Sequence, residues 1–313
     1  AAERFIAELI DLNIFDKVQN VTVDLYGSLS LTGIGHATDL AVMLGLSGAD
    51  PEYVPIEDIS GIVNKINETH LLNLGNAKKI HFIPKEHIVF NKNFLPFHAN
   101  GLTFTALYDN SQYVSTFYSI GGGFVVKEES AENAENDEIK ASFPFPVDKA
   151  EELLAFCRQE NKSISELVYE NELSLRSPEE IDRELMRIWN TMLECIYIGC
   201  HTEGTLPGGL NVRRRAFDTY QKLKSDLPYD NPQEWLQTIR KTKVYFRQIL
   251  KWVSCFALAV NEVNASLGRV VTAPTNGSAG VIPAVLMYYM VIENHKAGAK
   301  EIKQFLMVAG EIG

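Results

Sequence analysis

The polar segment from Arg269 to Gly280 reads RVVTAPTNGSAG and lies directly before an apolar helical pattern. Main-chain N–H groups at the start of a helix favour an anion such as a carboxylate. Thr272, Thr275 and Asn276 add side-chain donors, with Gly277 beside them. We therefore predict that this segment binds a small anionic substrate. On spacing alone, ordinary capping of the helix by Asn and Thr is an equally good interpretation.

A run of three glycines, Gly121, Gly122 and Gly123, follows a predicted strand in SIGGGF. Glycine lets the backbone approach a ligand closely, and glycine-rich loops of this kind bind phosphate in pyridoxal-phosphate enzymes. A tight turn between two strands is the alternative. The turn is favoured, because no partner lysine motif accompanies the loop.

Two histidines lie beside groups that could share a small polar ligand with them. His36 precedes Asp39 in YGSLSLTGIGHATD, and His98 is followed by Asn100 and Gly101. Side chains two residues apart on an extended segment point to the same face, so His98 and Asn100 could contact one ligand. A structural histidine with a satisfied hydrogen bond is the alternative in both cases.

The four cysteines, Cys157, Cys195, Cys200 and Cys255, are too few for a disulfide scaffold in a chain of this length, which favours a reducing, cytoplasmic compartment. Cys195 and Cys200 precede His201, but zinc sites usually use two closely spaced pairs. Buried small apolar side chains are therefore the prediction for these cysteines. The loop that follows, HTEGTLPGG, is polar enough to line a site.

The elements that must position these segments fall into two groups. Residues 1–127 predict an α+β domain, because a helix, a strand, a second helix and several strands rich in β-branched and aromatic residues follow one another. Residues 128–147 begin with an acidic stretch that has nothing to bury and predict a linker. Residues 148–313 predict an all-helical domain. Its expected helices cover 149–160, 163–175, 178–200, 231–264 and 281–295.

Composition excludes several classes of protein. With 40 acidic and 29 basic side chains, the net charge of −11 argues against nucleic acid as a partner. The longest apolar run, 281–292, contains Pro283 and is shorter than the roughly 20 residues that cross a membrane. The chain begins and ends within helical patterns, so we expect it to be a fragment of a longer polypeptide.

Several motifs together resemble one family. YGSLSLTGIGHATD, HANG, SIGGGF, NEL, HTEGTLPGGL and GRVVTAPTNGSAGVIPAV occur in this order along essentially the whole chain. They are similar to the iron–sulfur-dependent L-serine dehydratases of the bacterial single-chain type. YGSLSLTGxGHxTD and TAPTNG are specific to that family.

The resemblance implies an α+β regulatory domain followed by an all-α catalytic domain, in a cytoplasmic homodimer that acts on L-serine. It implies conversion of serine to pyruvate and ammonia by a 4Fe-4S cluster, one iron of which acts as a Lewis acid on the hydroxyl. His98, Asn100 and Gly101 would bind serine at a regulatory site. The loops that carry His36, Asp39 and the glycine run would contact the serine bound at this regulatory site. The residues that would support the substrate loop are Asn171, Glu203, Asn261 and Arg269.

The resemblance also places the three cluster cysteines beyond Gly313, so no metal ligand is expected in this chain. The 313-residue polypeptide is accordingly expected to be inactive on its own. Two alternatives stay open at this point. One is a pyridoxal-phosphate amino-acid dehydratase, which would need a Schiff-base lysine. The other is a serine-sensing module without catalysis.

Overall fold

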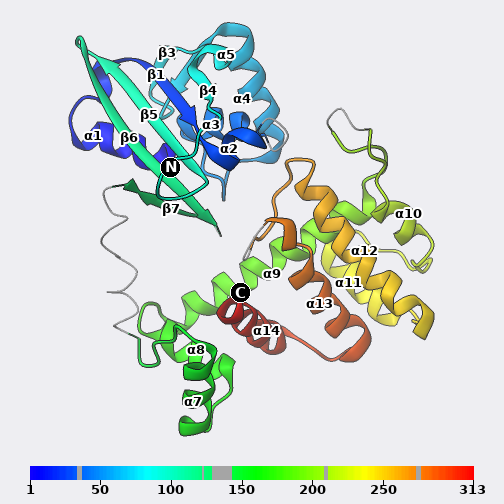
Figure 1. Cartoon of the computed structure of the whole chain (residues 1–313). Helices are drawn as coiled ribbons and strands as arrows, with labels where there is room; N and C mark the ends of the chain where they lie inside the picture. Colours follow the sequence, from blue (N-terminus) through cyan, green and yellow to red (C-terminus); the bar gives the residue numbers. More distant parts are fainter. Residues whose placement is uncertain (34–36, 122, 129–142, 208–210, 273–275) are drawn as a thin grey trace. The chain divides into compact units, whose positions relative to one another are not determined.

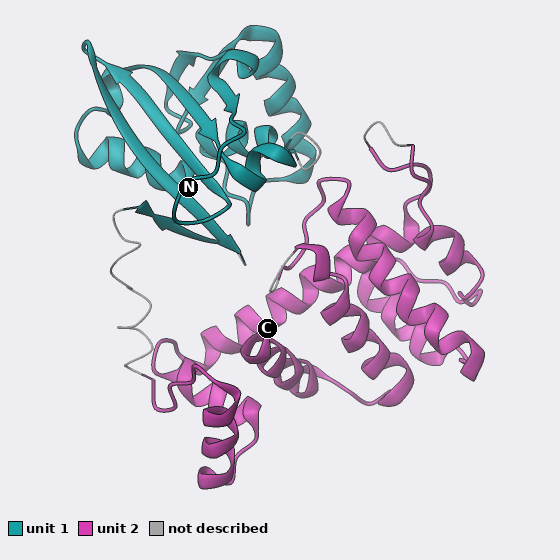
Figure 2. Ribbon diagram, in the orientation of Figure 1, with its two compact units in different colours: residues 1–134 teal, residues 135–313 magenta. Residues whose placement is uncertain are grey.

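The chain separates into two compact units, residues 1–134 and 135–313, each with its own hydrophobic core (Figures 1 and 2). The computed structural model describes residues 1–33, 37–121, 123–128, 143–207, 211–272 and 276–313. The first unit contains a β-sheet and helices, and the second is mostly helical, as predicted. Within these ranges, none of the helices combines the length and the apolar character needed to cross a bilayer.

A five-stranded sheet in the order β4-β1-β5-β6-β7 forms the centre of the first unit. β1 and β4 run parallel, and the other neighbours are antiparallel. Alternate residues of β1 are buried, among them Val21, Val23 and Leu25, as expected for a strand with one face in the core. The strands are β1 (Val18–Leu25), β4 (Ile88–Phe90), β5 (Gly101–Tyr108), β6 (Ser111–Gly121) and β7 (Phe124–Lys127).

Helices and a small hairpin complete the first unit. Phe5 of the first helix stacks on Phe104 of β5, with ring centroids 4.9 Å apart. The fourth helix was not predicted, although its apolar residues Ile59, Val63 and Ile66 have helical spacing. These elements are α1 (Ala2–Asp11), α2 (Gly27–Leu31), α3 (Thr38–Leu46), α4 (Ile56–Thr69), α5 (Pro84–His87), β2 (Leu71–Leu74) and β3 (Lys78–His81).

In the second unit, the other helices pack around one long helix, α9. Its start follows the sequence signal closely: the Ser177 side chain accepts a hydrogen bond from the Glu180 N–H, and Pro178 is the first helical residue. The helices are α7 (Ala150–Glu160), α8 (Ile164–Leu173), α9 (Pro178–His201), α10 (Ala216–Gln221), α11 (Pro232–Lys241), α12 (Phe246–Asn264), α13 (Val281–Tyr288) and α14 (Ala299–Ile312).

The single helix predicted over 231–264 is wrong, because the structure has two helices there. Thr242 and Tyr245 adopt extended backbone conformations between α11 and α12. The Thr242 hydroxyl donates to the Thr238 carbonyl oxygen, and the Thr242 N–H donates to the Ile239 carbonyl oxygen, each at 2.9 Å, so Thr242 closes the last turn of α11. The helix predicted over 281–295 is also shorter, since α13 passes into a π-helical turn at Tyr289–Glu293.

The backbones of α9 and α12 approach each other closely where the two helices cross. A Cβ atom added to Gly199 would lie 2.3 Å from the carbonyl oxygen of Ala259. Gly199 itself is buried, and so are Cys200 beside it and Cys255 on the facing helix. Glycine is therefore required at this crossing, because a side chain would force the two helix backbones apart.

Gly199→Ala should destabilise the second unit by about 1–3 kcal/mol, because overpacking at a backbone contact outweighs the better helix propensity of alanine. Gly310→Ala is the matched control, since Gly310 lies in α14 with open space around it. Urea unfolding followed by circular dichroism measures both. Equal midpoints for the Gly199→Ala variant and the wild type would contradict the requirement for a close crossing.

Candidate functional site

The predicted substrate segment follows the C-terminal end of α12. The helix is closed by the Gly268 N–H, which donates to the Val263 carbonyl oxygen at 3.0 Å. Thr272 is half-buried, and Asn276 and Gly277 are exposed in a short 3-10 turn before α13. Thr275 lies outside the described residues. The predicted loop before a helix is confirmed, and the Asn276 carboxamide is accessible to a ligand.

The loop after α9 folds back on itself between His201 and Arg215. Thr205 pairs with Arg213 in an isolated antiparallel bridge. The Arg214 N–H also donates to the Gly204 carbonyl oxygen at 2.9 Å. Glu203 is exposed at the base of this loop. The loop therefore presents a carboxylate on a backbone that main-chain hydrogen bonds hold in place.

A buried polar junction ties the loop after α9 to the end of α12. The Glu262 side chain, only 4% exposed, accepts hydrogen bonds from the N–H groups of Arg215 at 2.7 Å and Ala216 at 3.3 Å. The Arg214 guanidinium donates to the Ser266 hydroxyl at 2.5 Å, and this hydroxyl donates to the Glu262 carbonyl oxygen at 2.7 Å.

This junction holds together two segments that are 52 positions apart in sequence. The loop that carries Glu203 and the segment that leads to Thr272 are thereby anchored to the same five residues of the second unit. Sequence reasoning missed Arg214, Glu262 and Ser266, because nothing in their spacing indicates that they meet.

The three remaining predicted support positions differ in their surroundings. Asn261 is exposed on α12, one residue before Glu262, and Arg269 is half-buried between α12 and Thr272. Asn171, which is buried, lies on α8. Its carboxamide donates to the Phe145 carbonyl oxygen at 2.7 Å and accepts from the Phe145 N–H at 2.9 Å. Both ends of Asn171 therefore hold the chain that precedes α7.

In the first unit, the structure brings together motifs that are far apart in sequence. The N–H groups of Gly27 and Ser28, at the start of α2, donate to the carbonyl oxygens of Asn93 at 2.9 Å and Ala99 at 2.8 Å. A Cβ atom on Gly27, which has a φ of +53°, would lie 2.1 Å from the Ala99 oxygen. The loop that carries His98 therefore packs directly against the start of α2, and only glycine permits this approach.

The same loop is tied to the end of β6. The Asn100 carboxamide donates to the Ser119 carbonyl oxygen at 3.1 Å, and the Ser119 N–H donates to the main-chain carbonyl oxygen of Asn100 at 3.0 Å. The Asn100 N–H donates to Nδ1 of His98 at 3.1 Å, so the proton of a neutral His98 is on Nε2. His98 and Asn100 lie in a loop rather than in the extended segment expected.

The glycine run is the turn of the β6–β7 hairpin. Gly121 pairs with Phe124, and Gly121 and Gly123 have positive φ angles of 102° and 86°. The prediction of a tight turn between strands is confirmed, and Gly122 lies outside the described residues. Asp39 is half-buried in the first turn of α3, and His36 is not among the described residues.

The cysteines do not form a set that would hold an iron–sulfur cluster. Sγ of Cys200 faces Sγ of Cys255 at 3.8 Å, and burial raises the pKa of Cys195 to about 12 and that of Cys200 above its usual value. Cys157 lies on α7. Among the described residues, His, Cys, Asp and Glu side chains form no group of three that could bind a metal. No cluster chemistry is assigned to these thiols.

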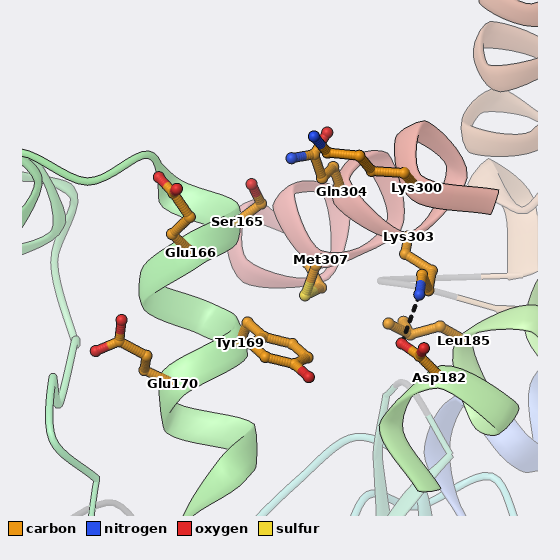
Figure 3. Close-up of a pocket in the computed structure, with 10 residues that line it drawn as sticks. All are labelled: Ser165, Glu166, Tyr169, Glu170, Asp182, Leu185, Lys300, Lys303, Gln304 and Met307. Carbon is orange, nitrogen blue, oxygen red and sulfur yellow. Dashed lines mark hydrogen bonds and ion pairs between the residues drawn. The ribbon is translucent and has the colours of Figure 1, made fainter. Parts of the chain in front are cut away.

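A hollow of about 330 Å³ lies between α8, α9 and α14 (Figure 3). Its charged groups are largely paired with one another or with neighbours: Lys303 contacts Asp182 at 2.6 Å, and Glu170 contacts Lys162 at 2.7 Å. It contains none of the predicted site residues. The candidate substrate site therefore remains at the ends of α9 and α12.

Two family models match the chain. The serine dehydratase beta chain model matches residues 1–130, and the serine dehydratase alpha chain model matches residues 159–313. The L-serine dehydratase of Haemophilus influenzae is 41% identical over 316 residues, and L-serine dehydratase 1 of Escherichia coli is 41% identical over 318 residues. An L-serine dehydratase of Streptomyces coelicolor is 41% identical over 320 residues.

Each of these alignments covers 100% of this chain and 66% of the relative, so the chain spans about two thirds of the length of these relatives. The beta-chain match falls on the unit with the sheet, and the alpha-chain match falls on the helical unit. Together the two matches cover both candidate binding regions. The chain belongs to the serine dehydratase family.

Proposed function

We propose that this protein is an L-serine dehydratase, which converts L-serine to pyruvate and ammonia. The observation that carries the proposal is the 41% identity to L-serine dehydratases along the whole chain. In this reaction serine loses its α-proton and its β-hydroxyl group as water. The resulting aminoacrylate tautomerises to an imine, which water hydrolyses to pyruvate and ammonia.

The substrate is proposed to bind at the ends of α9 and α12. Asn276 and the nearby main-chain N–H groups are suited to the carboxylate of serine, and the exposed Glu203 offers a charge opposite to that of its ammonium group. Thr272, Thr275 and Gly277 complete the carboxylate loop, with Asn261 and Arg269 beside it. Asn171 is proposed to act only through the chain that it holds.

The 4Fe-4S cluster of the family is proposed as the cofactor, with ligands other than the four cysteines of this chain. When bound, such a cluster supplies a Lewis acid for the serine hydroxyl. We derive no step through it, because the thiols described above do not converge. The expected homodimer stays a prediction. Sedimentation velocity of the purified protein would test it.

The pyridoxal-phosphate alternative is disfavoured by the fold. Its proposed phosphate loop is a hairpin turn at Gly121 and Gly123, and the described residues of the second unit form helices with one isolated bridge instead of alternating strands and helices. An absorbance band at about 410–430 nm that borohydride removes would favour that alternative.

The polypeptide as its gene encodes it should form pyruvate from L-serine after anaerobic reconstitution with iron and sulfide. Pyruvate is measured with a coupled dehydrogenase, and D-serine is the control substrate. Exposure to air should abolish the activity if a cluster is required. Pyruvate formation by protein stripped of iron, at the full rate, would contradict the proposed cofactor.

Asn276→Ala should lower kcat/KM for serine roughly 10- to 150-fold, since a hydrogen bond to a charged group contributes about 1.5–3 kcal/mol. Asn67→Ala on the exposed face of α4 is the matched control and should leave kcat/KM unchanged. Wild-type efficiency in the Asn276→Ala variant would show that the loop has only a structural role.

The first unit is proposed to bind serine as a regulator at the junction of α2, the His98 loop and the β6–β7 hairpin. His98→Ala should change the dependence of rate on serine concentration more than the maximal rate. The matched control is His81→Ala, on the exposed side of β3.

Asn100→Ala should act similarly, but it also removes the hydrogen bond to Ser119 and so requires an unfolding measurement beside it. Identical serine curves for wild type and the His98→Ala variant would refute the regulatory role.

A further inference from the structure

His201, the last residue of α9, is surrounded by aromatic side chains. Tyr197 stacks on its ring with centroids 4.1 Å apart, and the rings of Tyr220, Tyr229 and Trp235 lie 5.0, 5.5 and 5.8 Å away. Trp235 is completely buried, and His201 is half-buried. The imidazole is thus held at the point where α9 passes into the loop that carries Glu203.

Hydrogen bonds run from Trp235 to His201 in one direction. The Trp235 N–H donates to the Tyr220 hydroxyl at 2.8 Å, Tyr220 and Tyr229 hydroxyls are 2.7 Å apart, and Tyr229 lies 2.7 Å from Nε2 of His201. An indole can only donate. Tyr220 therefore accepts from Trp235. Its own proton is then available to the Tyr229 hydroxyl, and the Tyr229 proton is available to Nε2 of a neutral His201.

The other ring nitrogen fixes the tautomer of a neutral His201. Nδ1 of His201 lies 2.6 Å from the Tyr197 carbonyl oxygen, which can only accept, so Nδ1 carries the proton. A neutral imidazole protonated at Nδ1 satisfies every member of the chain. An imidazolium would instead donate from Nε2 to the Tyr229 hydroxyl, so Nε2 could no longer accept the Tyr229 proton.

The surroundings favour the same neutral form. Burial lowers the pKa of His201 below its usual value, and the positive charge of Lys224 lowers it further. The hydrogen bond to the Tyr197 carbonyl oxygen acts in the opposite direction and does not cancel these effects. The titratable groups that face the ring are Tyr197 from α9, Tyr220 from α10, Tyr229 from the chain before α11, and Lys224. Burial raises the pKa of Tyr197 and of Tyr220 above the usual tyrosine value, which keeps both hydroxyls neutral at physiological pH.

This network is connected to the candidate substrate site through the backbone. His201 is followed by Thr202, whose hydroxyl donates to the Ile198 carbonyl oxygen at 2.7 Å, and by Glu203. Gly204 is then held by Arg214, which reaches Ser266 at the end of α12. The orientation of the last turn of α9 therefore sets where the Glu203 backbone leaves the helix.

We propose that His201 is a positioning residue for serine dehydration, held as a neutral imidazole by the donor chain Trp235–Tyr220–Tyr229 so that the Glu203 loop keeps its place beside the substrate loop. The proposal rests on the proposed function. It assigns His201 no contact with serine.

The test uses Tyr229→Phe in the polypeptide as its gene encodes it. This variant removes the donor to Nε2 and keeps the ring. NMR of the protein labelled at histidine Cε1 measures the pKa of His201, with the signal assigned by its absence in His201→Gln. The pKa should rise by about half a unit or more, because a hydrogen bond to the neutral form has been lost. kcat should fall about 10- to 100-fold with a smaller change in KM, and the acidic limb of the pH–kcat profile should move to higher pH.

Two controls separate charge from position. Lys224→Gln removes a positive charge near His201 and leaves the donor chain intact, so it should raise the pKa slightly and leave kcat above pH 8 unchanged. Tyr53→Phe, at a tyrosine that is 66% exposed in the first unit, should change neither value. If Tyr229→Phe unfolds, His201→Gln supplies the kinetic comparison, and an unaltered kcat there overturns the proposal.

The remaining outcomes are distinct. An unchanged His201 pKa in Tyr229→Phe would refute the donor chain. A raised pKa with unaltered kcat and pH profile would reduce His201 to a structural residue. If the reconstituted wild type makes no pyruvate, the proposed function fails and this role fails with it, while the NMR titration still reports the donor chain independently.

Discussion

The second unit depends on the close crossing of α9 and α12 at Gly199 and Ala259. No side chain separates the two backbones there, so Gly199 lies directly against the main chain of Ala259. His201 ends one helix, and Glu262 to Ser266 end the other. The segment that carries Glu203 begins directly after α9, and the segment from Arg269 to Gly277 follows the end of α12. A wider crossing would separate the two loops before any polar interaction could join them.

Polar contacts then convert this proximity into a defined arrangement. A buried carboxylate is costly unless it is hydrogen-bonded, and Glu262 satisfies this requirement with the main-chain N–H groups of Arg215 and Ala216. Arg214 reaches Ser266 in the same junction. The first unit uses a similar principle, since backbone hydrogen bonds of Ser28 and Ser119 hold the His98 loop from two sides. In both units, main-chain groups connect segments that the sequence separates.

Much of the fold could be predicted from local signals, because those signals are local in physical origin. Ser177 and Pro178 mark the start of α9, and the alternation in β1 marks a strand with one buried face. The break at Thr242 was missed, because both flanking segments are good helix formers and no glycine or proline between them marks the end of α11. The turn at Gly121 and Gly123 was predicted, because the glycine run follows a strand and no lysine motif accompanies it.

The candidate site was less accessible to sequence reasoning. Asn276 was identified from its neighbours, yet the contact of Arg214 with Ser266 joins residues 52 positions apart and leaves no local trace. Cys195 and Cys200 were considered as a pair because they are close in sequence, whereas Cys200 faces Cys255 across two helices. Side-chain pairs of this kind follow from the helix crossing and cannot be obtained from spacing along one helix.

The junction at Glu262 also determines which mutations the protein can tolerate. Glu262 binds the backbone of Arg215 and Ala216 and not their side chains, so the join makes no demand on residue type at 215 beyond a free N–H. Every residue except proline supplies that group. The cost of sequence change at this contact is therefore one-sided: position 215 can vary, whereas position 262 must keep a hydrogen-bond acceptor. A population of related chains would show variety at one end of the contact and a carboxylate at the other.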